Sequence, residues 1–63
     1  MMPAYRTYCL DGSGRIRLSD VIEADGDVAA IGTAKVQHRG AIKCEVWHLN
    51  RLVATLDAQD LAG

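Results

Sequence analysis

Two cysteines and two histidines are the residues best suited to thiol chemistry or soft-metal binding: Cys9, Cys44, His38 and His48. Structural zinc usually takes four converging ligands, often supplied as two closely spaced pairs, and this chain has no Cys-x-x-Cys. Cys44 and His48 are four residues apart, which separates them by ~13 Å on an extended strand. We therefore expect no metal site and no cofactor.

Either cysteine could act as a nucleophile beside a histidine. A reactive thiolate needs an electropositive and partly exposed setting, whereas Cys9 and Cys44 lie in apolar strand patterns that favour burial. We therefore expect no enzyme activity. A minimal thiol-dependent enzyme or redox protein that uses Cys9 or Cys44 is the alternative.

The cysteine count also bears on the compartment. Secreted chains of this length usually carry four to eight cysteines, and the first residues do not follow the pattern of a signal peptide. We expect a cytoplasmic protein with reduced thiols.

Composition limits the classes of partner. Seven basic and eight acidic residues give a formal net charge of -1, so the basic excess of a nucleic-acid binder is absent. No apolar run approaches the ~20 residues of a membrane span. We expect neither nucleic acid nor a membrane as the main partner, with weak nucleic-acid binding through Arg6, Arg15 and Arg17 as a second alternative.

The first third of the chain predicts a β-hairpin. Residues 5–10 favour a strand, 11–14 favour a turn in which Gly12 and Gly14 can adopt positive φ, and 15–18 alternate polar and apolar side chains. Residues 19–24 are expected to lead into a helix.

Start and stop signals then predict one helix over roughly residues 26–39. Asp25 is the expected N-cap, and Gly40 is expected to end the helix in the left-handed conformation. Asp27 adds negative charge at the positive end of the helix dipole.

The last third predicts a second hairpin, with strands over residues 41–48 and 52–56. The turn around Leu49 and Asn50 could hold two or three residues, which leaves the register of the last strand open. Residues 58–63 are expected to be a loose tail. The chain is thus predicted to be one α+β domain over residues 1–63, a two-layer ββαββ fold with a four-stranded antiparallel sheet, one helix on one face and strand order 2-1-3-4.

Two apolar stripes run along the predicted helix. Ala30, Ile31, Ala34 and His38 form one stripe, which should cover the sheet. The nearly opposite stripe comprises Val28, Ala29, Gly32 and Val36. Because a 63-residue monomer has nothing left to cover it, this second stripe predicts self-association as a homodimer. The alternative is that these are isolated exposed residues.

Trp47 should lie on the sheet face that the helix leaves open, and a three-residue turn would place Val53 beside it. Such an exposed patch would suit contact with an unidentified protein partner. The alternative is a Trp47 ring half-covered by long neighbouring side chains.

Four motifs cover most of the chain: Tyr-Arg-x-Tyr-x-Leu-Asp-Gly-x-Gly at 5–14, Ile-Glu-Ala-Asp at 22–25, Glu-Val-Trp at 45–47 and Arg-Leu-Val-Ala at 51–54. In these motifs the chain resembles a group of very short hypothetical proteins from alphaproteobacteria. That group has no assigned function, so the resemblance implies no catalytic residues. Taken together, the residues predict a small non-catalytic protein-interaction or regulatory module that self-associates.

Overall fold

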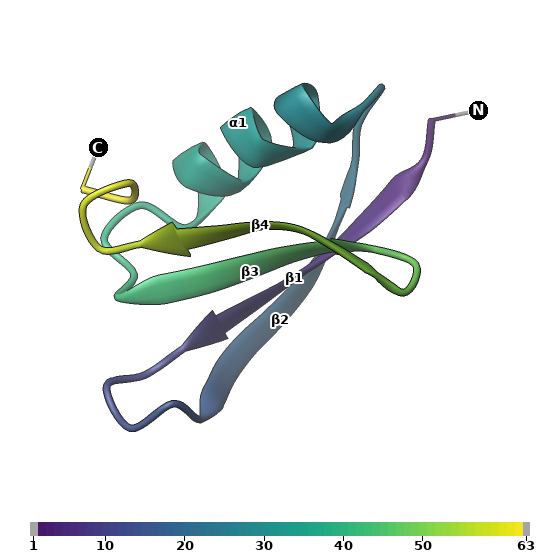
Figure 1. The fold of residues 1–63 in the computed structure, drawn as a ribbon. Helices are drawn as coiled ribbons and strands as arrows, with labels where there is room; N and C mark the ends of the chain where they lie inside the picture. The colour runs from purple at the N-terminus through teal and green to yellow at the C-terminus, as the bar shows by residue number, and fades with distance from the viewer. Residues whose placement is uncertain (1, 63) are drawn as a thin grey trace.

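The computed structural model describes residues 2–62, which form one antiparallel sheet and one helix (Figure 1). The elements follow in the order β1 (Ala4–Leu10), β2 (Ile16–Glu23), α1 (Asp27–Gln37), β3 (Lys43–His48) and β4 (Arg51–Asp57). The strands lie in the order β2-β1-β3-β4. The predicted two-layer ββαββ fold and its strand order are therefore confirmed.

The first hairpin closes through an aspartate-centred turn. Asp11 Oδ1 accepts hydrogen bonds from the backbone N–H of Ser13 at 2.9 Å and of Arg15 at 3.0 Å. Gly14 takes φ 85°, whereas Gly12 does not adopt positive φ. Strand β2 continues to Glu23, which pairs with Ala4, so the expectation that residues 19–24 lead into the helix is wrong.

Helix α1 begins differently from the prediction. Its N-cap is Gly26, which offers no side-chain cap, so the assignment of Asp25 as N-cap is wrong. Asp27, in the first turn, directs its carboxylate to Tyr5 and Arg51. At the other end Gly40 takes the predicted left-handed conformation, with φ 87°.

The second hairpin has a two-residue turn, in which His48 pairs with Arg51. Leu49 holds the positive φ, 57°, and Asn50 does not. Because of this pairing Leu52 lies opposite Trp47, and a register shift between Val46 and Trp47 then leaves Val53 as an extra residue and places Ala54 opposite Val46. This β-bulge, invisible to a simple period of two, decides which side chains of β4 share a face with β3.

The core lies between α1 and the inner face of the sheet, and it includes Leu61, which is fully buried. The backbone around Leu61 is tied to both sides: its carbonyl accepts the Gly40 N–H at 2.7 Å, and its N–H donates to Asp57 at 3.0 Å. The expected loose tail over residues 58–63 is therefore wrong as far as residue 62. Residue 63 lies outside the described residues.

Candidate functional site

Cys9 and Cys44 lie directly opposite each other on the two central strands, β1 and β3. Their Cα atoms are 4.0 Å apart, and their sulfur atoms form a disulfide. The side chains reach this position because both strands turn the same face toward α1, where Cys9 is 5% and Cys44 0% exposed. The expectation of two reduced thiols is corrected by this pairing.

The His38 ring lies next to the two sulfur atoms, on the helix side of the sheet. His38 follows the last residue of α1 and continues the inner stripe of Ala30 and Ala34, so its side chain is buried against the sheet at 6% exposure. One ring nitrogen of His38 and the sulfur atoms of Cys9 and Cys44 lie within 4.8 Å of one another. These three residues lie far apart in the sequence, and the fold brings them together.

Thr7 holds the His38 ring in place. Its Oγ1 lies 3.1 Å from His38 Nε2, and the Thr7 side chain is fully buried. Thr7 shares the inner face of β1 with Cys9, two residues along the strand, because side chains two residues apart point the same way. A polar pair thus lies next to the disulfide inside an otherwise apolar layer.

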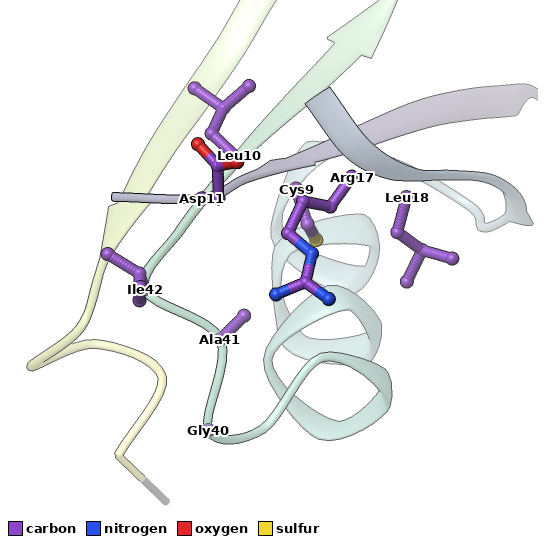
Figure 2. A pocket seen from close by; sticks show the side chains of 8 residues that line it. All are labelled: Cys9, Leu10, Asp11, Arg17, Leu18, Gly40, Ala41 and Ile42. Atoms are coloured by element: carbon purple, nitrogen blue, oxygen red, sulfur yellow. The ribbon is translucent and has the colours of Figure 1, made fainter. Parts of the chain in front are cut away.

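A pocket of about 470 Å³ opens beside Cys9. Figure 2 shows it between the end of β1, the start of β2 and the loop that follows α1, with the Arg17 side chain extending toward Gly40 and Ala41. Cys9 lines this pocket and Cys44 does not. Both cysteines are buried, and Cys9 is the one that borders this pocket.

A second β-bulge positions one of the two charged side chains of this pocket, that of Arg17. The register of β1 against β2 shifts between Cys9 and Leu10, so that Cys9 pairs with Leu18 and Leu10 pairs with Ile16. Arg17 is the extra residue, and it lines the pocket together with Leu18. The pocket wall next to Cys9 therefore carries one guanidinium, from Arg17, and one carboxylate, from Asp11.

The outer stripe of α1 is exposed. Val28 is 85% and Val36 67% exposed, and Ala29 and Gly32 are also exposed. A Cβ added at Gly32 would meet nothing within 4 Å. Packing within the chain thus does not account for a glycine in the middle of this helix.

The predicted patch of Trp47 and Val53 does not form as a pair. Trp47 is half-buried on the open face of the sheet, where its Nε1 donates to Glu45 at 3.2 Å and Arg6 lies opposite on β1. Val53 instead packs partly against the core. The two-residue turn causes the difference, since the pairing of His48 with Arg51 brings Leu52, and not Val53, opposite Trp47.

The three arginines of the first hairpin do not gather on one face. Arg6 lies opposite Trp47 on β3, Arg15 lies in the turn before β2, and Arg17 lines the pocket beside Cys9. A continuous basic strip across this hairpin is therefore absent from the described residues.

A polar cluster ties the start of α1 to the sheet. Asp27 accepts a hydrogen bond from the Tyr5 hydroxyl at 2.9 Å and a two-point contact from the Arg51 guanidinium at 3.0 and 3.1 Å. The bonds from Arg51 and then from Tyr5 lower the pKa of Asp27, while burial and the bond to Asp27 raise the pKa of Tyr5. This cluster has a structural part, because it fixes the helix over β1 and β4.

The pairing of Cys9 with Cys44 could have been found from two signals already in the sequence. The strand order 2-1-3-4 makes their strands neighbours, and both cysteines lie in the apolar positions of those strands. The pairing also requires the register between β1 and β3, which no local sequence pattern specifies. Arg17 was missed as a pocket residue because its place depends on the bulge.

No family model matches the chain, and neither the curated proteins nor the solved structures include a significant match to it. Among the described residues, no helix has both the length and the apolar character needed to cross a membrane.

Proposed function

We propose that the protein is a small non-catalytic regulatory module of the cytoplasm whose state is set by oxidation and reduction of the Cys9–Cys44 disulfide. The observation that carries the proposal is the position of this disulfide between the two central strands, with one of its cysteines lining an open pocket. Disulfides in cytoplasmic proteins are usually transient and redox-sensing, which fits a regulatory bond better than a permanent one.

The disulfide is placed where its loss would change the fold most. Within residues 2–62, the first hairpin meets the second in the sheet only through the pairing of β1 with β3. The bond closes a loop with a sequence separation of 35 residues, for which chain entropy predicts a stabilisation of about 3–4 kcal/mol. That is a large fraction of the stability of a domain this small. Reduction would therefore loosen the junction between the hairpins.

The pocket determines which sulfur atom a reductant attacks first, because Cys9 borders it and Cys44 does not. The thiolate of a dithiol reductant attacks Cys9 Sγ, the S–S bond breaks, and Cys44 Sγ leaves as a thiolate that takes up a proton. The second thiolate of the reductant then attacks the reductant sulfur atom that is bonded to Cys9 Sγ in the mixed disulfide. This step releases Cys9 as a thiol and leaves the reductant as a disulfide, so that two electrons have passed to the protein.

A matched pair of variants tests this direction. In Cys44→Ser the remaining thiol is Cys9, which lines the pocket, whereas in Cys9→Ser it is the fully buried Cys44. We expect oxidised glutathione to form a mixed disulfide with Cys44→Ser at least ~10-fold faster than with Cys9→Ser, measured by mass spectrometry. Equal rates for two folded variants would show that the pocket does not make Cys9 the more reactive cysteine. No reaction with either variant would refute the proposed function.

A second candidate function is self-association through the outer stripe of α1, with a second copy of the chain as the partner. It is supported by the exposure of Val28 and Val36 and by the free space at Gly32, where glycine otherwise costs about 1 kcal/mol in a helix interior. A two-fold dimer would bring the stripe against itself and give the glycine a packing role.

Light scattering at high micromolar concentration tests this candidate. We expect a dimer for the natural sequence and monomers for Val36→Glu and Gly32→Lys. Gln37→Glu is the control for added negative charge, because Gln37 is exposed and, at 3.6 residues per turn, points away from the stripe. A monomeric natural protein would end this candidate, and a dimer that survives both stripe variants would move the contact to the sheet.

A further inference from the structure

We infer that the reduced protein binds one zinc ion through Cys9, Cys44 and His38. The proposal rests on the opening of the disulfide described above, since only free thiolates can serve as ligands. The three side chains are buried together, and their ligand atoms lie within 4.8 Å of one another. They come from β1, β3 and the end of α1, so the fold rather than the sequence spacing assembles them.

The ligand set suits zinc. Two thiolates and one imidazole are typical zinc ligands, and three protein ligands leave a fourth position open. With Zn–S bonds of about 2.3 Å, a tetrahedral site needs ~3.8 Å between the two sulfur atoms. Opposite positions on adjacent strands, with Cα atoms 4.0 Å apart, allow the sulfur atoms to separate to that distance by side-chain rotation.

Charge and solvent access also fit. Two thiolates neutralise the charge of Zn²⁺, so the occupied site would carry no net charge into the buried layer. The pocket beside Cys9 lets water reach the fourth position. With Nδ1 of His38 as the zinc ligand, Thr7 Oγ1, 3.1 Å from Nε2, would be the outer hydrogen-bond partner that metal-binding histidines usually have.

The site and the disulfide exclude each other. When oxidised glutathione oxidises the pair, it accepts two electrons and is cleaved to two thiolates, which take up protons from the solvent. The sulfur atoms of Cys9 and Cys44 join, which leaves His38 as the one remaining ligand and releases the ion. Reduction restores the dithiol, and zinc binding then displaces the two thiol protons to the solvent. The same three residues would thus report both the redox state and the supply of zinc.

Cobalt titration tests the inference on fully reduced protein without air. A phosphine opens the disulfide in mild denaturant, becoming a phosphine oxide with oxygen from water while the hydrogen atoms of that water end on the two thiols. The denaturant is then removed. This preparation does not depend on exchange with glutathione, so a failure here is separate from a failure of the proposed function. Alkylation of an aliquot confirms two free thiols.

We expect one Co²⁺ per chain, with the absorption of tetrahedral cobalt thiolate, and complete displacement by Zn²⁺. His38→Asn should weaken binding at least ~10-fold, and Cys9→Ser or Cys44→Ser should abolish the thiolate spectrum expected of two sulfur ligands. His48→Asn is the matched control and should bind as the natural sequence does, because His48 lies against the Tyr5 ring and outside the cluster.

Thermal unfolding supplies the second readout. Zinc should raise the melting temperature of the reduced natural protein, because an ion that binds the folded state stabilises it by mass action. It should have no such effect on the double variant Cys9→Ala/Cys44→Ala. Reduced protein that binds no Co²⁺, or that binds it equally well without His38, would overturn the inference.

Discussion

Oγ1 of Thr7 lies 3.1 Å from Nε2 of His38, and both side chains are buried beneath the end of the helix. This contact joins β1 to the helix end two residues from Cys9. It therefore fixes the histidine next to the disulfide. A second contact of the same hydroxyl, 3.5 Å from the carbonyl of Asp20, ties the pair to β2.

Replacing Thr7 with valine tests this contact. The change keeps the shape of the side chain but removes the hydroxyl, which leaves a buried imidazole nitrogen without its partner. We expect the free energy of unfolding to fall by about 1–3 kcal/mol in urea denaturation. Thr7→Ser, which keeps the hydroxyl, is the control and should lose clearly less. Equal losses in the two variants would show that the methyl group, and not the hydrogen bond, matters.

Removal of the disulfide should have a larger effect. We expect Cys9→Ala/Cys44→Ala to unfold with about 3–4 kcal/mol less free energy than the oxidised natural protein, because the unfolded chain regains the freedom of a long loop. Cys44→Ala alone should lose nearly as much, since one cysteine cannot form the bond within the chain. An oxidised protein no more stable than the double variant would contradict the account of the junction between the hairpins.

The buried position of Leu61 makes a prediction about the end of the chain. Leu61→Ala should lower the free energy of unfolding by about 2–5 kcal/mol, because it leaves a cavity between the end of β4 and the loop after α1. Gln59→Ala, at an exposed position in the same segment, should stay within about 0.5 kcal/mol of the natural protein. A loose tail would instead make the two variants alike.

Asp27 predicts a dependence of stability on acid. Hydrogen bonds from Arg51 and then Tyr5 lower its pKa in the folded protein below the ordinary value near 3.8. A lowered folded pKa stabilises the protein above the unfolded pKa, and this contribution is lost as the pH falls through the folded pKa. The stability difference between the natural protein and Asp27→Asn should therefore be constant near neutral pH and shrink on acidification below about pH 4.

Urea denaturation at a series of pH values measures this difference. Asp25→Asn is the control, because it removes a neighbouring carboxylate that makes no hydrogen bond to Tyr5 or Arg51. A difference between natural protein and Asp27→Asn that persists unchanged to the lowest pH at which both fold would count against the carboxylate contacts.

The fold was predictable because local patterns determine most of it. β-favouring residue types mark β1, alternation marks β3, and the inner stripe of Ala30, Ala34 and His38 orients the helix. Leu61 could not be foreseen as core, since a single leucine in a polar tail has no period. Val53 does not lie beside Trp47 because the turn holds two residues rather than three, and the bulge after Val46 then makes Val53 an extra residue in β4.

The candidate site was harder to predict for a different reason. Cys9, His38 and Cys44 lie on three elements far apart in the sequence, and their meeting depends on the register of β1 against β3 and on the position of the helix above them. Spacing along the chain carries no trace of such an arrangement. Residue type alone identified the candidates, and only the fold showed that they converge.

The reduction potential of the Cys9–Cys44 pair tests the central claim most directly. The protein is equilibrated with mixtures of reduced and oxidised glutathione, quenched with an alkylating agent and analysed by mass spectrometry. A regulatory bond should give a single two-electron transition with a midpoint above about −300 mV, within reach of the cytoplasmic glutathione pool. Cysteines that stay fully oxidised down to potentials well below that value would identify the bond as a permanent structural disulfide and contradict the proposed regulatory function.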